Sequence, residues 1–262
     1  MPEYRWQSHR IVRPLRVYLL DRSWSPDGWP LVADDLWRVV HSDRSGVRQV
    51  DPAAVGLGLG AALLIELALC GQIVLAGGRL HLAEDLEAFL RHRGRPAVGS
   101  GAPGWPSGGG SVLPDRAADE LLMVIFREPQ PLPVDDWLAF AAQRAYEKVA
   151  RRMLDAGHVR EQRTRRLLSR HPVYPPVDMN VAGWPPTRLA MPLRSGSGDP
   201  LDLDVVLLGL CREIGVTHWI FDDLPAGAVE AFCRRPEALA APLPELLSRL
   251  AAAIAAASAR LR

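Results

Sequence analysis

The longest apolar run of the chain extends from Val55 to Leu69, and Glu66 is the only charged residue among its 15 positions. A run that is apolar on every side predicts a helix covered by the rest of the protein, because a surface helix would show a polar face. At this length it is too short to span a bilayer. The GxGxG motif at Gly56 to Gly60 lies inside the run, not after a strand. We therefore interpret its glycines as sites of close helix packing, and not as a nucleotide-binding loop.

A tight β-hairpin is predicted directly after this helix. Gly71 ends the helix, and two short β-prone segments, residues 72–75 and 79–82, flank Ala-Gly-Gly. Glycine adopts the positive φ angles that a two-residue hairpin turn requires.

Apolar positions at helical spacing predict several further helices. We expect them at Leu31 to His41, Glu84 to Arg93, Asp115 (as N-cap) to Arg127, Val134 to Ala156, Asp199 to Ile214, Pro225 to Arg234 and Pro244 to Leu261, with a second short hairpin at His158 to Leu168. The predicted fold class is mainly α: a single globular helical domain with one or two short β-hairpins.

Proline and glycine mark the predicted domain organisation. Residues 1–30 contain Pro14, Pro26 and Pro30 and are interpreted as an N-terminal extension to a helical domain at 31–262. Within residues 99–110, ten of the twelve positions are Gly, Ser or Pro, which indicates a loop inside that domain. This loop lacks the Gly-Lys-Ser/Thr ending of a phosphate-binding P-loop.

Composition narrows the class of protein. Of 262 residues 48% are hydrophobic and the net charge is +1, which favours a packed globule and excludes nucleic-acid binding by overall charge. The three cysteines, Cys70, Cys211 and Cys233, are expected to be buried free thiols in a reducing compartment. The N-terminal arginines precede no apolar signal region, so a cytoplasmic location is expected.

The sequence predicts no catalytic, metal-binding or cofactor-binding residues. None of the seven histidines has metal-ligand spacing, and no GxSxG motif is present. Acidic pairs occur at residues 34–35, 135–136 and 222–223, but all lack the DDxxD spacing of magnesium-diphosphate sites. Whether the chain is an enzyme stays open, and the balance favours a binding protein.

One basic segment points to a phosphate-bearing partner. Arg144, Lys148 and Arg151 are spaced i, i+4 and i+7, so they share one helix face opposite an apolar stripe, and Arg152 follows directly. Residues 151–170 contain seven arginines and two acidic residues, which gives this segment a net charge of +5. Such a face can bind phosphate or an anionic membrane surface, or it can simply be solvated.

Two segments resemble the Golgi phosphoprotein 3 family. They are Leu63-Leu-Ile-Glu-Leu-Ala-Leu69 with the following hairpin, and Glu147-Lys-Val-Ala-Arg-Arg-Met-Leu-Asp-Ala-Gly157. The resemblance covers about Leu31 to the C-terminus. It implies a mostly helical domain, peripheral to membranes, which binds phosphatidylinositol 4-phosphate and client proteins. It also implies self-association through the hairpin, here through Ile73, Leu75, Leu80 and Leu82.

This sequence departs from the family pattern at the positions of the headgroup pocket. Family members that bind the headgroup use a Trp and an Arg before the core helix and two Arg three residues apart. These positions correspond here to Asp51, Gly60, Gln143 and Tyr146.

Our leading hypothesis is a peripheral membrane-associated protein that recognises an anionic phospholipid headgroup, such as phosphatidylinositol 4-phosphate, through Arg144, Lys148, Arg151 and Arg152. One alternative is an enzyme or accessory protein acting on an isoprenoid diphosphate or another phosphorylated metabolite. Another is a protein adaptor without lipid binding.

Overall fold

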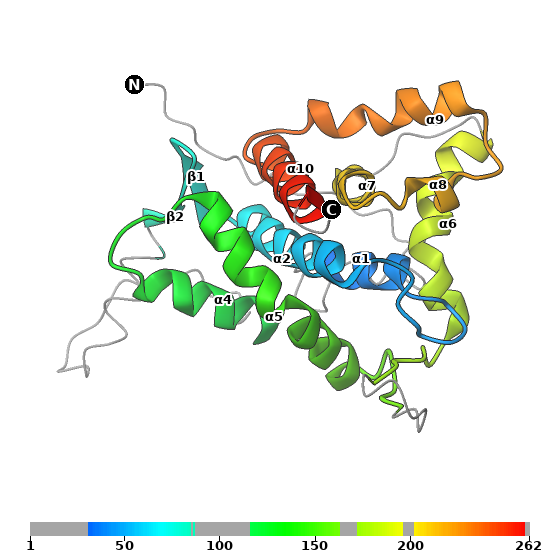
Figure 1. Ribbon diagram of the computed structural model, residues 1–262, viewed down its shortest axis with the longest axis horizontal. Helices are drawn as coiled ribbons and strands as arrows, with labels where there is room; N and C mark the ends of the chain where they lie inside the picture. Colours follow the sequence, from blue (N-terminus) through cyan, green and yellow to red (C-terminus); the bar gives the residue numbers. More distant parts are fainter. Residues whose placement is uncertain (1–30, 85, 87–115, 163–171, 196–201, 260–262) are drawn as a thin grey trace, which may run out of the picture.

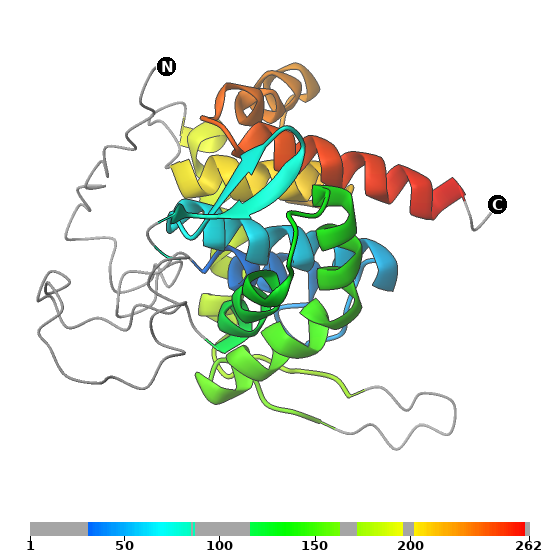
Figure 2. The ribbon, with the colours of Figure 1, turned by 90° about the vertical axis from the view of Figure 1, so that its left-hand side faces the viewer.

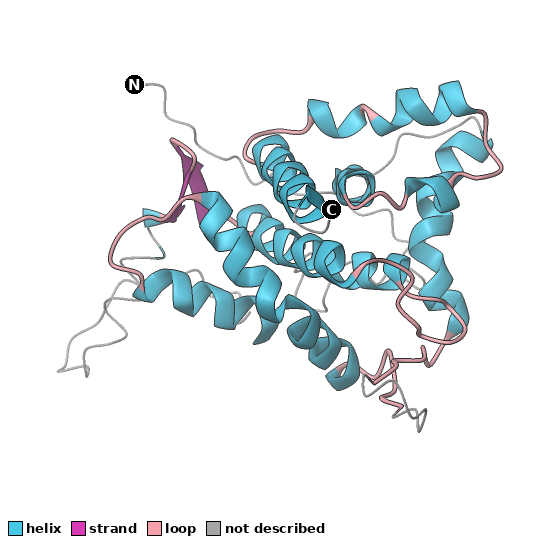
Figure 3. Ribbon diagram, in the orientation of Figure 1, coloured by secondary structure: helices cyan, strands magenta, loops and turns pink. Residues whose placement is uncertain are grey.

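The computed structural model describes residues 31–84, 86, 116–162, 172–195 and 202–259. In this part of the chain helices predominate, and two strands form one antiparallel hairpin (Figures 1 and 3), which confirms the mainly α fold class. In chain order the elements are α1 (Val32–Val40), α2 (Pro52–Leu69), β1 (Ile73–Ala76), β2 (Arg79–Leu82), α4 (Arg116–Arg127), α5 (Val134–Asp155), α6 (Met179–Ser195), α7 (Asp202–Glu213), α8 (Thr217–Ile220), α9 (Ala226–Cys233), the 3-10 helix η1 (Arg235–Ala238) and α10 (Leu243–Ala259).

Helix α2 runs through the middle of the molecule. Figure 1 shows α4 and α5 on one side of it and α7 and α10 on the other, with α1 packed near its end. The helix begins three residues earlier than predicted, because Asp51 caps it by accepting hydrogen bonds from the backbone N–H of Ala53 and Ala54. With 18 residues, the helix is long and apolar enough to cross a membrane, but 67% of its residues are buried in the protein. It therefore forms the centre of the hydrophobic core.

The glycines of the GxGxG motif bring neighbouring helices close to α2. A Cβ atom at Gly56 would lie 2.9 Å from the backbone oxygen of Ala142 in α5, and one at Gly60 would lie 3.0 Å from the Ala142 nitrogen. On another face, a Cβ at Gly58 would lie 2.9 Å from the Ile214 side chain. The predicted packing role of these glycines is confirmed, since any side chain there would displace a neighbour.

The hairpin lies against the helical body of the protein (Figure 2). Strand β1 contacts α2, and β2 contacts α4 and α5. Gly77 and Gly78 have φ angles of +58° and +72° and form its two-residue turn. Leu75 pairs with Leu80 and Ile73 with Leu82, so all four apolar residues share one face. Ile73 and Leu80 are only 1% exposed, and Leu75 and Leu82 are half-buried. The outward face carries the side chains of Val74, Ala76, Arg79 and His81.

Helix α6 was not predicted, because Pro185, Pro186 and Pro192 lie inside it. Asp178 begins it by accepting hydrogen bonds from the N–H groups of Asn180 and Val181. Farther along, the Thr187 hydroxyl donates to the Gly183 carbonyl. Short helix α8 was also not predicted.

Several other predictions fall wholly or partly outside the described residues. These are the N-terminal extension at 1–30, most of the helix at 84–93 and the loop at 99–110. Of the second predicted hairpin, Val159 and Gln162 form antiparallel bridges with Pro176 and Val173, and residues 163–168 are not described. The cysteines are free, but only Cys211 is buried, whereas Cys70 and Cys233 are half-buried.

Candidate functional site

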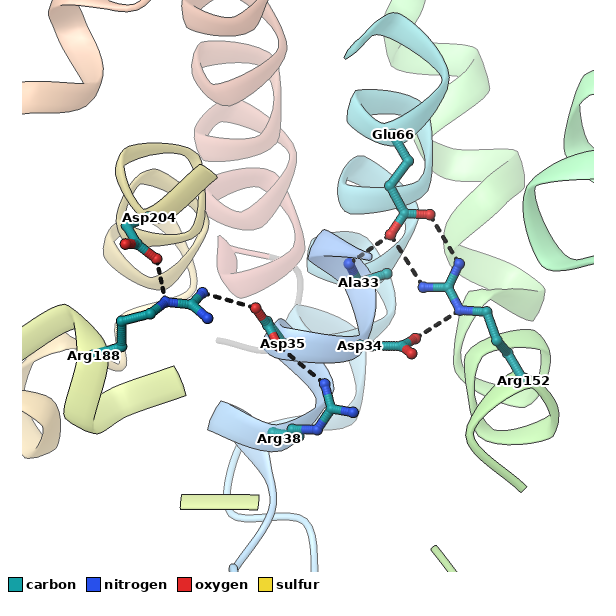
Figure 4. Close-up of polar contacts among 8 residues, drawn as sticks. All are labelled: Ala33, Asp34, Asp35, Arg38, Glu66, Arg152, Arg188 and Asp204. Atoms are coloured by element: carbon teal, nitrogen blue, oxygen red, sulfur yellow. Dashed lines mark hydrogen bonds and ion pairs between the residues drawn. The ribbon is translucent and has the colours of Figure 1, made fainter. Parts of the chain in front are cut away.

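Among the residues that the structure describes, the most buried charged side chains form an ion-pair network around the start of α1 (Figure 4). On one side Arg152 of α5 contacts Asp34 of α1 at 2.6 Å and Glu66 of α2 at 2.9 Å. Glu66 also accepts a hydrogen bond of 2.8 Å from the backbone N–H of Ala33. Three helices are therefore fixed to one another by groups that would be costly to leave unpaired.

On the other side of α1 the network continues through Asp35. Its two carboxylate oxygens contact Arg38 at 3.0 Å and Arg188 of α6 at 2.9 Å (Figure 4). Arg188 also contacts Asp204 of α7 at 2.5 Å. Asp34 and Asp35 thus face opposite sides of α1 and are engaged by arginines, which suits a structural role better than a shared metal ion.

In each of the other two acidic pairs, one aspartate forms an ion pair. Asp135 contacts Arg249 at 3.0 Å, and Asp223 contacts Arg194 at 2.9 Å. The hydrogen bond from Arg194 lowers the pKa of Asp223. Within the described ranges no group of three or more His, Cys, Asp or Glu residues is placed to hold a metal ion.

An aromatic cluster lies beside this network. Trp37 stacks on His41 with ring centroids 4.2 Å apart and contacts the Tyr146 and Tyr174 rings. Burial lowers the pKa of His41 to about 4, so the ring is neutral near pH 7. Its Nδ1 lies 2.8 Å from the Trp37 carbonyl and its Nε2 lies 3.1 Å from the Tyr146 hydroxyl. The neutral ring donates from Nδ1, and Tyr146 donates to Nε2.

The four positions of the family's headgroup pocket do not form a cationic site in this chain. Asp51 caps α2, and Gly60 lies in the contact with α5, where a longer side chain would collide with the backbone. Gln143 is exposed, and Tyr146 belongs to the aromatic cluster. One cation close to these positions is Arg48, which lies 5.2 Å from the centroid of the Tyr146 ring.

A basic groove lies instead between α4 and α5. Its volume is about 520 Å³, within the usual range of ligand sites. Arg127, Arg144 and Lys148 supply its positive charges, and Asp119 and Glu120 its negative ones. The remaining lining is apolar: Leu63, Leu121, Met123, Val124, Phe140 and Ala141. Phe140 is 41% exposed, so the groove offers apolar surface next to cations.

The structure separates the four basic residues that the sequence grouped together. Arg144 and Lys148 both line the groove, and Lys148 contacts Glu120 at 3.2 Å. Arg151 lies outside the groove lining, is exposed and pairs with Asp155 at 3.3 Å. Arg152 is only 9% exposed and is held in the buried network. Arg127 was not predicted, because its contribution depends on how α4 packs against α5.

The fold is a helical domain in which a buried apolar helix is followed by a hairpin and enclosed by amphipathic helices. The chain belongs to the Golgi phosphoprotein 3 (GPP34) family, whose model matches residues 32–259. A comparison with curated proteins gives no match.

Proposed function

We propose that this protein is a peripheral membrane-associated binding protein that recognises an anionic phospholipid headgroup, such as phosphatidylinositol 4-phosphate, through the basic groove. The observation that carries the proposal is the placement of Arg127, Arg144 and Lys148 around an open groove with apolar walls. Family membership supports the same class of function. In the cell, the protein would act at the cytoplasmic surface of a membrane.

The groove offers partners both for the phosphate of a phospholipid headgroup and for the apolar atoms next to it. Guanidinium groups bind phosphate oxygens in pairs of parallel hydrogen bonds, and Arg127 and Arg144 are both exposed for such contacts. Val124 and Phe140 provide apolar surface for the adjoining glycerol and first methylene groups. Lys148 must exchange its contact with Glu120 for one with the ligand.

Vesicle co-sedimentation tests this proposal. Neutral phosphatidylcholine vesicles are compared with vesicles that also contain phosphatidylinositol, its 4-phosphate or cardiolipin, at low and high salt. The test variant is Arg127→Gln/Arg144→Gln/Lys148→Gln. Its matched control is Arg160→Gln/Arg194→Gln/Arg234→Gln, which removes the same charge from exposed positions elsewhere. At about 1 kcal/mol for each basic residue, the test variant should bind roughly a hundredfold more weakly.

Equal losses in the two triple variants would mean that the groove is not the binding site. No binding of the wild type to any anionic vesicle would contradict the lipid function itself. Protein partners and soluble phosphorylated metabolites would then remain as the two alternatives.

A further inference from the structure

Two guanidinium groups of the basic groove have no counterion among the residues that the structure describes. Arg127 of α4 and Arg144 of α5 both line the groove and are exposed, and within the described ranges neither forms a side-chain ion pair or hydrogen bond. Lys148, the third cation of the groove, is already paired with Glu120 at 3.2 Å. The groove therefore offers two uncompensated positive charges to a ligand.

Two such charges suit a phosphomonoester better than a phosphodiester. A phosphomonoester carries a charge of about −1.5 to −2 near neutral pH, and its three terminal oxygens can accept hydrogen bonds from two guanidinium groups at once. A phosphodiester, which links the headgroup in most membrane phospholipids, carries a single negative charge. The charge of the groove thus favours a terminal phosphate.

The rest of the groove lining is largely apolar. On each wall an apolar side chain lies about one helical turn before the arginine, Val124 on α4 and Phe140 on α5. Phe140 is 41% exposed, and the buried Leu63 of α2 contributes to the inner lining. A ligand covered with hydroxyl groups would leave them without partners against these side chains, whereas a hydrocarbon chain covers them without such a cost.

The groove is also larger than one phosphate group needs. Its volume of about 520 Å³ is some three times the roughly 150 Å³ of an engineered apolar cavity that holds benzene. A phosphate bound at the arginines therefore leaves room in the groove for several methylene groups.

We propose that the basic groove binds a single-chain phosphomonoester, that is, a hydrocarbon chain that ends in a terminal phosphate. Arg127 and Arg144 hold the phosphate between them, and the first part of the chain lies against Phe140. This inference rests on the proposed binding of an anionic lipid in the same groove. It narrows that function in two respects, because the phosphate is terminal and the chain itself is recognised.

Isothermal titration calorimetry of the full chain with three soluble probes tests the proposal, each probe below the concentration at which it forms micelles. Decyl phosphate has the chain and the terminal phosphate, decyl sulfate has the same chain with a single negative charge, and glycerol 3-phosphate has the phosphate without the chain. Decyl phosphate should bind about fivefold more tightly than decyl sulfate, because more negative charge faces the two arginines. It should bind roughly a hundredfold more tightly than glycerol 3-phosphate, since burial of about four methylene groups accounts for a factor of this size.

The proposal is overturned if decyl phosphate does not bind, if decyl sulfate binds more tightly, or if glycerol 3-phosphate binds as well as decyl phosphate.

Two variants assign the binding to this groove. Phe140→Ala removes apolar surface from one wall and should weaken decyl phosphate binding about tenfold, with no change for glycerol 3-phosphate. Its matched control is Met191→Ala, which shortens a 47% exposed side chain of α6 outside the groove lining. Arg127→Gln/Arg144→Gln should remove the preference for phosphate over sulfate. Equal losses in Phe140→Ala and Met191→Ala would show that the chain does not lie in the groove.

Vesicle co-sedimentation separates this inference from the proposed function. If the wild type binds anionic vesicles through the groove but does not bind decyl phosphate, the headgroup function stands and the inference fails. If decyl phosphate binds in the groove but no anionic vesicle retains the protein, the membrane function fails and the phosphomonoester is taken up from solution.

Discussion

Two adjacent arginines of α5 show how strongly the function of a residue depends on its surroundings. Arg151 is exposed and pairs with Asp155, one helical turn farther on. Arg152 points inward and is 118 and 86 positions away in sequence from its partners Asp34 and Glu66. Helical spacing identified the shared face of Arg144, Lys148 and Arg151, but nothing local indicates partners at such sequence distances. The assignment of Arg152 to an internal network therefore required the three-dimensional structure.

Arg152→Met should lower the free energy of unfolding by about 3–5 kcal/mol, because it leaves Asp34 and Glu66 buried without their shared cation. Arg151→Met removes only an exposed pair and should cost roughly 0.5 kcal/mol or less. Urea unfolding of both variants, monitored by circular dichroism, measures the difference. A loss of the same size in the two variants would contradict the structural role of Arg152.

The buried His41 should make stability depend on pH. Its pKa is about 4 in the folded protein against an ordinary value of 6.5, so the unfolded state binds a proton more readily. Stability is therefore complete above about pH 6.5 and is lost as the pH falls toward 4, by on the order of 3 kcal/mol. His41→Gln should flatten the dependence between pH 7.5 and 5, whereas His218→Gln, on an exposed surface, should keep it. Unfolding curves at the two pH values that change equally in all three proteins would show that other groups are responsible.

Helices and strands with a strong apolar pattern were predicted from the sequence. Elements that depend on contacts with distant parts of the chain were not. Helix α2 and the hairpin followed from an unbroken apolar run and the Gly-Gly turn. Helix α6 did not, because its prolines are normally incompatible with a helix interior. Its N-terminal cap at Asp178 was the one available local signal, and its other support is tertiary, through Arg188. The basic groove likewise needed the packing of α4 against α5, so Arg127 could not be placed from sequence.

The close packing of α2 against α5 can be tested by substituting a glycine at the contact. Gly60→Ala places a Cβ 3.0 Å from the Ala142 nitrogen and 3.2 Å from the Ala141 Cβ. Overpacking of this kind costs about 1–3 kcal/mol, more than the roughly 1 kcal/mol that alanine contributes to a helix. Gly227→Ala in α9 meets no atom within 4 Å and should instead stabilise the protein slightly. The midpoint temperature of thermal unfolding should fall in Gly60→Ala and rise in Gly227→Ala. A higher midpoint in Gly60→Ala would mean that α2 and α5 can move apart without a loss of stability.

For the whole molecule, a net charge of +1 provides little long-range attraction to an anionic surface. Binding of a headgroup must therefore depend on where the charges lie, and within the groove Glu120 opposes it in two ways. It holds Lys148 at 3.2 Å, and its own negative charge faces the incoming phosphate.

Glu120→Gln should consequently strengthen binding to anionic vesicles about fivefold, because it frees Lys148 and removes roughly 1 kcal/mol of unfavourable charge. Glu147→Gln makes the same change of charge one residue from Lys148, at an exposed position that is not part of the groove lining. Co-sedimentation at low salt compares the two variants with the wild type. If Glu147→Gln strengthens binding as much as Glu120→Gln, the protein senses a membrane by its overall charge, and the groove has no special part in recognition.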